Sequence, residues 1–129
     1  MRVKDVMSPQ IITISPNDTA QSAARLMLDA EIGALPVEVP GTAAIVGIVT
    51  DRDIVVSVVA QGLSGSTAVA EFMTVATETC HEDDDTAAVA GRMLALGVRR
   101  LVVVDGERRT IGIVTLSDLP VADAEGSRP

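Results

Sequence analysis

The chain has 129 residues, enough for one compact domain or two small halves that share a core, and its hydrophobic content of 47% supplies the material for that core. The formal net charge of −8 excludes a general nucleic-acid-binding surface, because phosphate contacts need clustered basic residues. Phe72 is the only aromatic residue, so we expect a core of aliphatic side chains and methionine.

The sequence also limits the compartment in which the protein works. No stretch approaches the roughly 20 apolar residues of a membrane-spanning helix, and the first residues, MRVKDVMSP, lack the apolar core of a signal peptide. The single cysteine, Cys80, excludes an intrachain disulfide. These features predict a cytoplasmic protein that does not associate with a membrane.

The first half of the chain predicts a strand, a helix, two strands and a second helix. QIITISP is an extended run that Pro16 closes. Asp18 begins a D-x-x-Q pattern that resembles a capping box, ahead of an amphipathic helix over about residues 19–30. ALPVEV and AIVGIV predict strands on either side of the turn PGTA, and Pro36 is expected at a strand start or in an edge strand. The second helix is expected to begin at Thr50.

The second half predicts the same series of elements. The acidic run at residues 82–85, EDDD, provides a cap for a helix that continues through Met93 to Leu96. Gly97 is suited to end that helix in the left-handed conformation. RLVVVD and TIGIVT predict strands, Pro120 cuts the last helix short, and DAEGSRP is expected to be a mobile tail.

The two halves are copies of one another. Met7 aligns with Met73 at a spacing of 66 residues, and GIVTDRDI at residues 47–54 recurs as GIVTLSDL at residues 112–119. Such self-similarity over the whole chain indicates a tandem repeat. We therefore divide the chain into repeat 1 (residues 1–62), repeat 2 (residues 63–122) and a tail (residues 123–129).

The motifs resemble a known family. DVMSP, TISPNDTAQSAARLM, IGALPV and GIVTDRDI, followed by EFMT, GVRRLVVV and GIVTLSD, are similar to a pair of cystathionine-β-synthase (CBS) domains over about residues 2–122. The resemblance implies an α/β fold of tandem β-α-β-β-α repeats related by pseudo-two-fold symmetry. It also implies clefts between the repeats that bind adenine nucleotides in many members, and frequent pairing of two such modules into a disc-shaped dimer.

The repeated T-x-x-D motif has two interpretations. A threonine at the start of a helix, followed three residues later by an aspartate, is an ordinary capping box. The resemblance implies instead that the aspartates, Asp53 and Asp118, accept hydrogen bonds from ribose hydroxyls, while Thr50 and Thr115 hold the sugar–phosphate side. A carboxylate suits a vicinal diol because it has two acceptor oxygens. Capping and ligand binding are compatible with one another.

By the same resemblance, residues of the other repeat complete each cleft. The first cleft combines Thr50 and Asp53 with Arg52, His81, Arg99 and Arg100. The second combines Thr115 and Asp118 with Ser15, Ala20 and Gly33. The arginines give the first cleft the cations that a phosphate needs, whereas the acidic run at residues 82–85 opposes an anion there. The alternative for Arg99 and Arg100 is pairing with that run at the surface.

Groups for catalysis are missing from the sequence. His81 is the only histidine, nothing pairs it with a nucleophile, and no Gly-rich phosphate loop is present. Cys80 and His81 are too few ligands for a metal site. The sequence therefore predicts a non-catalytic homodimeric module with no required cofactor, which binds AMP, ADP, ATP or a related adenosine compound and signals to a separate partner protein. The alternative is a dimerisation or docking scaffold that works without a ligand.

Overall fold

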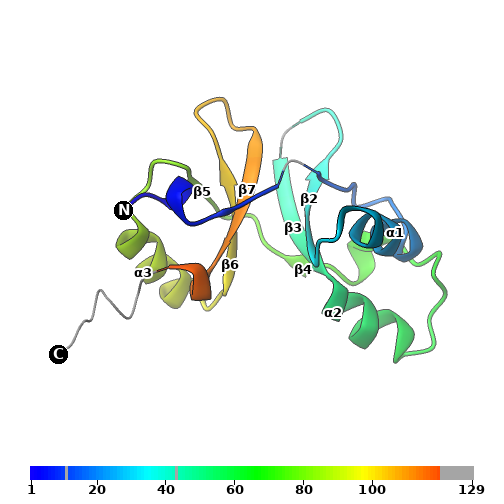
Figure 1. Cartoon of the computed structure of the whole chain (residues 1–129). Helices are drawn as coiled ribbons and strands as arrows, with labels where there is room; N and C mark the ends of the chain where they lie inside the picture. Colours follow the sequence, from blue (N-terminus) through cyan, green and yellow to red (C-terminus); the bar gives the residue numbers. More distant parts are fainter. Residues whose placement is uncertain (11, 43, 120–129) are drawn as a thin grey trace. The chain divides into compact units, whose positions relative to one another are not determined.

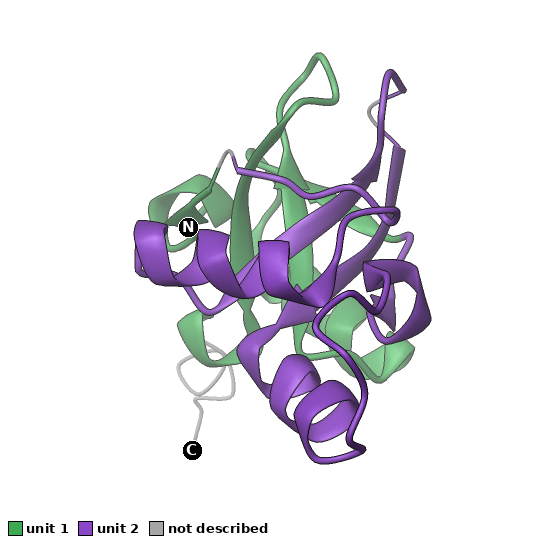
Figure 2. Cartoon of the chain, turned by 90° about the vertical axis from the view of Figure 1, so that its right-hand side faces the viewer, with its two compact units in different colours: residues 1–11, 78–129 green, residues 12–77 purple. Residues whose placement is uncertain are grey.

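The chain folds as two units, each with its own sheet, helices and core. The computed structural model describes residues 1–10, 12–42 and 44–119 (Figure 1). Unit 2 contains residues 12–77, and unit 1 combines residues 1–11 with residues 78–129 (Figure 2). Both units mix helices with strands, so the predicted α/β class is confirmed.

Unit 2 is built on a three-stranded antiparallel sheet in the order β2-β3-β4. Its strands are β2 (Ala34–Val39), β3 (Ala44–Thr50) and β4 (Thr74–Val75), and its helical elements are α1 (Ala20–Ala30), α2 (Asp51–Ile54), η2 (Val55–Val59) and η3 (Val69–Glu71). The outer strand β2 contains Pro36, as predicted for a residue that cannot donate a ladder hydrogen bond.

Unit 1 has a four-stranded sheet in the order β1-β7-β6-β5, in which β5 and β6 are parallel and the other pairs antiparallel. Its strands are β1 (Ser8–Pro9), β5 (Thr79–His81), β6 (Arg100–Val104) and β7 (Thr110–Thr115). Its helical elements are η1 (Val3–Asp5), α3 (Thr86–Leu96) and η4 (Leu116–Asp118). Pro120 and the tail at residues 123–129 lie outside the described residues.

The start of α1 differs from the sequence prediction. Thr19, rather than Asp18, caps the helix, because Thr19 Oγ1 accepts a hydrogen bond from the Ser22 N–H (3.1 Å). The Asp18 carboxylate closes the preceding turn, where it accepts the Ser15 N–H (2.9 Å). The predicted D-x-x-Q cap is therefore wrong by one residue, although the predicted helix is confirmed.

The other helix boundaries agree with the sequence. Asp85, within the acidic run, caps α3 by accepting the N–H groups of Ala87 and Ala88 (3.1 and 3.3 Å), and Gly97 ends α3 with a φ of 71°. The helix predicted at Thr50 begins there as α2 and continues into the π-helical turn η2. Within the described residues, no helix is long and apolar enough to cross a bilayer.

The first residues of each repeat pack in the unit formed mainly by the other repeat: residues 1–11 belong to unit 1, and unit 2 extends to residue 77. Strand β1 pairs with β7, and β4 pairs with β3. In both places a methionine sulfur lies too close to leave room for a Cβ on the glycine: Met7 Sδ is 2.7 Å from an ideal Cβ on Gly112, and Met73 Sδ is 2.7 Å from one on Gly47. The glycine of each GIVT motif is therefore required by this close packing.

Each unit has an aliphatic core, as the composition predicts. The unit 2 core contains Ile14, Ala20, Ala23, Met27, Leu35, Val37, Val49, Ile54, Val58, Val69 and Phe72. The unit 1 core contains Val3, Cys80, Val89, Ala90, Met93, Leu101, Val103, Val114 and Leu119. Val3 and Val69 are fully buried, so they anchor the two leading segments.

Candidate functional site

The first T-x-x-D motif forms a complete capping box at the start of α2. The Thr50 N–H donates to Asp53 Oδ2 (2.9 Å), and the Asp53 N–H donates to Thr50 Oγ1 (3.1 Å). Thr74 Oγ1 lies 3.4 Å from both carboxylate oxygens. An ionised carboxylate has about four acceptor positions, so the half-buried Asp53 keeps acceptor capacity for a ligand. The capping interpretation is confirmed, and it is compatible with a role of Asp53 in ligand binding.

The second motif is more exposed and precedes a shorter helical element. The Thr115 N–H donates to Asp118 Oδ2 (3.1 Å), and Thr115 Oγ1 lies 3.0 Å from Ser117 Oγ. Asp118 is exposed, and η4 is a single three-residue turn. The two motifs therefore share the backbone arrangement but differ in burial and in the length of the helix that follows.

The residue that precedes β2 in unit 2 and the residue that precedes β6 in unit 1 each contact the T-x-x-D motif of the same unit. The Asp51 N–H donates to the Gly33 carbonyl (3.0 Å), and the Leu116 N–H donates to the Arg99 carbonyl (2.8 Å). An ideal Cβ on Gly33 would lie 3.1 Å from Asp51 Oδ2. Position 33 is therefore next to a carboxylate in unit 2, while the equivalent position in unit 1 is an arginine. Sequence reasoning missed Asp51.

Arg100 lies beside the second motif, because it pairs with Thr115 across β6 and β7. His81 pairs with Val104 at the other end of β6, four residues or about 13 Å along the strand. Unit 1 thus brings Arg99 and Arg100 to Thr115 and places His81 at the far end of the sheet. The predicted pairing of His81, Arg99 and Arg100 with Thr50 and Asp53 of the other unit stays a prediction.

Ser15 and His81 occupy equivalent turns in the two units. Ser15 Oγ accepts the Asn17 N–H (3.1 Å), and His81 Nδ1 accepts the Asp83 N–H (3.1 Å). The 3.8 Å separation between His81 Nδ1 and the Asp83 carboxylate is longer and needs a charged ring. We therefore assign Nδ1 as an acceptor, which leaves the proton on Nε2 as a donor for another group. Ala20, at the start of α1, is buried.

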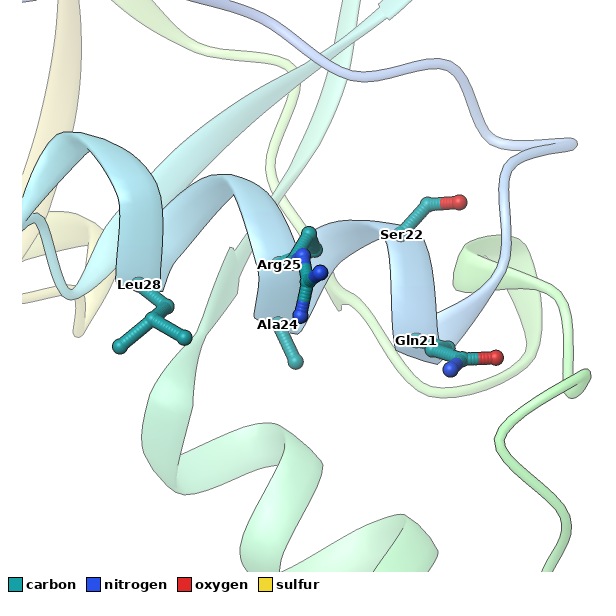
Figure 3. Close-up of a pocket in the computed structure, with 5 residues that line it drawn as sticks. All are labelled: Gln21, Ser22, Ala24, Arg25 and Leu28. Carbon is teal, nitrogen blue, oxygen red and sulfur yellow. The ribbon is translucent and has the colours of Figure 1, made fainter.

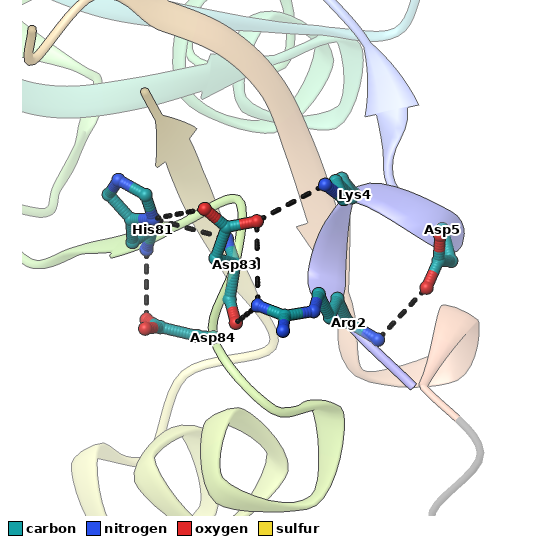
Figure 4. Close-up of polar contacts among 6 residues, drawn as sticks. All are labelled: Arg2, Lys4, Asp5, His81, Asp83 and Asp84. Carbon is teal, nitrogen blue, oxygen red and sulfur yellow. Dashed lines mark hydrogen bonds and ion pairs between the residues drawn. The ribbon is translucent and has the colours of Figure 1, made fainter. Parts of the chain in front are cut away.

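Two basic residues of the N-terminal segment pair with Asp83 of the acidic run (Figure 4). Lys4 Nζ lies 3.2 Å from Asp83 Oδ1, and Arg2 Nη1 lies 3.6 Å from the same atom. The hydrogen bond from Lys4, together with the charges of Lys4 and Arg2, holds the pKa of the Asp83 carboxyl below its ordinary value. The ion pairs between described residues do not involve Arg99 or Arg100, so this run is not their partner there.

Two grooves lie along α1. Ala20, which lines one of them, is the one predicted site residue in their linings. One, of about 460 Å³, is lined by Gln21, Ser22, Ala24, Arg25 and Leu28 (Figure 3). The other, of about 410 Å³, is mainly apolar and is lined by Ala20, Gln21, Ala24, Ile54, Val58, Val59, Leu63 and Gly65. Neither includes a residue of a T-x-x-D motif.

The described residues contain no group of three or more histidine, cysteine, aspartate or glutamate side chains that could hold a metal ion. Cys80 is buried in the unit 1 core. Burial raises the pKa of its thiol to about 11, and the negative charge of Asp84 adds to the shift. The thiol is therefore a poor nucleophile at neutral pH.

Comparison with known proteins identifies the family. The CBS domain family matches residues 3–60 and 69–123. A CBS domain-containing protein of Bacillus subtilis, YhcV, is 40% identical over 119 residues, which cover 92% of this chain and 83% of YhcV. Inosine-5′-monophosphate dehydrogenase of Methanocaldococcus jannaschii is 34% identical over 119 residues, but these cover 92% of this chain and only 23% of that enzyme.

A solved structure extends this comparison to the fold. The CBS domain pair of protein MJ0100, in complex with 5′-methylthioadenosine and S-adenosyl-L-methionine, is similar to this chain with a TM-score of 0.73 and 34% sequence identity. The similarity covers 92% of this chain and 91% of that one. The resemblance drawn from the sequence is therefore confirmed, and the chain belongs to the CBS domain family, with two CBS domains in tandem.

Proposed function

We propose that this chain is a regulatory module that binds an adenosine-containing ligand and signals its presence to a separate partner protein. The observation that carries the proposal is the start of α2, where Asp53 Oδ2 holds the Thr50 N–H and the carboxylate keeps acceptor positions for a ribose diol. The bound 5′-methylthioadenosine and S-adenosyl-L-methionine of MJ0100 support an adenosine compound as the ligand.

Each predicted residue has a role in this proposal. Thr50 and Asp53 hold the ribose, and the Nε2–H of His81 donates to an acceptor on the ligand. Arg52, Arg99 and Arg100 supply cations for a phosphate, if the ligand is AMP, ADP or ATP. Thr115 and Asp118, with Ser15, Ala20 and Gly33, form the second site. How the residues of the two units combine is part of the proposal.

The module regulates and does not catalyse in this proposal. In the dehydrogenase, the region similar to this chain covers only 23% of the enzyme, which supports a separate role for such a pair. No cofactor is required beyond the regulatory ligand. We also propose a cytoplasmic location, since the single cysteine, Cys80, is a free thiol.

Calorimetric titration of ligand-free protein tests the proposal. The protein is unfolded, dialysed and refolded to remove carried-over nucleotide, and is then titrated with AMP, ADP, ATP, 5′-methylthioadenosine and S-adenosylmethionine. Guanosine monophosphate is the control ligand. Binding of at least one adenosine compound is expected, with a gain of about 2.7 kcal/mol in unfolding free energy at a hundredfold excess over Kd. Absence of binding by all five compounds would contradict the proposal.

A second candidate function, self-association without a ligand, is favoured by the apolar surface of unit 2. Leu28, Val59 and Leu63 are 69%, 67% and 50% exposed, and the last two line the 410 Å³ groove. Exposed apolar surface of this extent is typical of interaction sites. We propose a homodimer, which is the commonest closed assembly. Sedimentation equilibrium at micromolar concentration tests it, and a monomer would contradict it.

A further inference from the structure

A second carboxylate, that of Asp51, lies at the start of α2 together with Asp53, to which the proposed function assigns the ribose. Asp51 is the first residue of the helix and Asp53 the third, so both carboxylates belong to its first turn. Asp51 is exposed, and the ion pairs between described residues do not include it. The charge of Asp51 is therefore available to act on a ligand that Asp53 binds.

Gly33 leaves open the space beside the Asp51 carboxylate. The Asp51 N–H donates to the Gly33 carbonyl (3.0 Å), and this hydrogen bond holds the start of α2 next to the residue that precedes β2. An ideal Cβ on Gly33 would lie 3.1 Å from Asp51 Oδ2, which is closer than an ordinary van der Waals contact. Both residues are exposed, so a ligand group reaches the carboxylate over the glycine.

The backbone N–H groups at the start of α2 are largely occupied. Those of Thr50 and Asp53 form the capping box, and that of Asp51 is bonded to the Gly33 carbonyl. A helix N-terminus binds a phosphate through unpaired N–H groups, so this one has few donors for a phosphate. The motif TDRD contains two carboxylates and one guanidinium, that of Arg52, and its net charge is therefore −1.

The equivalent motif of unit 1 lacks the second carboxylate. Leu116 stands where the first repeat has Asp51, and Arg99 stands where it has Gly33. Arg100 pairs with Thr115 across β6 and β7, so it also lies beside this motif. The two motifs share their backbone hydrogen bonds but differ in the sign of the charge around them, negative in unit 2 and positive in unit 1.

We infer that Asp51 makes the site at Asp53 selective for an adenosine compound without a phosphate, whose 5′ substituent is a neutral thioether or a positively charged sulfonium. This inference rests on the proposed function and selects among the ligands proposed there. A 5′-phosphate lies close to the ribose that Asp53 holds, and charges in solution interact over about 8 Å at physiological ionic strength. The Asp51 carboxylate therefore repels a phosphate, whereas it attracts a sulfonium and leaves the binding of a thioether unchanged.

The ratio of the Kd for AMP to the Kd for 5′-methylthioadenosine tests the inference, measured by calorimetry on the refolded, ligand-free full chain. AMP is expected to bind about fivefold or more weakly than the thioether. Asp51→Asn removes the charge at nearly constant size, and it is expected to tighten the binding of AMP alone and so to remove most of the ratio. Asp51→Leu, which introduces the side chain of the second repeat, is expected to act in the same way. Both variants should bind S-adenosylmethionine more weakly than the original chain.

Glu38→Gln is the matched control, because it removes one negative charge from the other end of β2, four residues or about 13 Å from Ala34. It is expected to leave the ratio unchanged, and far-UV circular dichroism verifies that each variant is folded. AMP that binds the original chain as tightly as the thioether would overturn the inference, as would a ratio that both Asp51 variants leave unchanged. Absence of binding by every adenosine compound would overturn the proposed function itself, so the two failures are distinguishable.

Discussion

Replacing Gly47 with alanine tests the packing that the GIVT motif makes. An ideal Cβ at this position would lie 2.7 Å from Met73 Sδ and 2.7 Å from the carbonyl oxygen of Thr74. The methionine can change rotamer, but Thr74 is held by its pairing with Ile48 across β3 and β4. Because a backbone atom must move, Gly47→Ala is expected to lower the unfolding free energy by about 1–3 kcal/mol.

The matched control has the opposite expected sign. Gly91 lies in the interior of α3, and a Cβ there would meet nothing within 4 Å. Gly91→Ala should therefore stabilise the chain by about 0.5–1 kcal/mol, from helix propensity alone. Gly112, packed against Met7, should behave like Gly47.

Urea unfolding followed by far-UV circular dichroism measures these differences. Circular dichroism is preferred because the chain has no tryptophan or tyrosine for fluorescence. A Gly47→Ala variant as stable as Gly91→Ala would refute the argument that this glycine is required by close packing.

Three further predictions concern single groups. In the native protein the pKa of the Cys80 thiol is raised to about 11. Near pH 8 its thiolate fraction is therefore expected to be about a hundredfold lower than in the unfolded chain, so a disulfide reagent should react with Cys80 only on unfolding. Lys4→Met should raise the lowered pKa of Asp83 in an NMR titration. A carboxyl group with a lowered pKa stabilises the folded state at pH values above the ordinary carboxyl pKa, and this stabilisation is lost as the pH falls through the lowered pKa. The variant should therefore be less stable than the original chain at neutral pH and equally stable at strongly acid pH. Glu31→Gly should raise the melting temperature and add up to about 1 kcal/mol to the unfolding free energy, because Glu31 ends α1 with a φ of 56°, in the left-handed region that favours glycine. A lowered melting temperature would contradict this explanation of the helix end.

Local signals in the sequence predicted the family and most of the longer helices and strands. The strand predicted over residues 10–16 is wrong, because among its described residues only Ile14 forms a β-bridge, to Val37. Thr50 and Asp53 form the predicted capping box, and Gly97 ends α3 in the predicted left-handed conformation. The cap of α1 was misplaced because Asp18 and Thr19 both have side chains suited to capping. The choice between them depends on the preceding turn, where the Ser15 N–H donates to the Asp18 carboxylate. The sequence pattern does not reveal this hydrogen bond.

Long-range contacts were beyond the sequence pattern. The pairing of Arg2 and Lys4 with Asp83 joins residues about 80 positions apart, and it exists because the leading segment packs in the unit formed by the second repeat. The same packing of the leading segment brings Met7 into contact with Gly112. A repeat alignment identifies equivalent residues, but it does not identify which copy each one contacts.

Binding of an adenosine ligand by Asp53→Ala protein, compared with Asp118→Ala, tests the central claim most directly. Each lost hydrogen bond to a charged carboxylate is expected to cost about 1.5–3 kcal/mol of binding, so Asp53→Ala should abolish measurable binding while its lost cap costs about 0.5–2 kcal/mol of stability. Asp118→Ala should lose less, since Asp118 is exposed and precedes a single turn. Calorimetric titration of ligand-free proteins gives the answer: loss of binding with Asp53→Ala supports a ribose site at the start of α2, and unchanged affinity with a lowered melting temperature would show that Asp53 serves the helix alone.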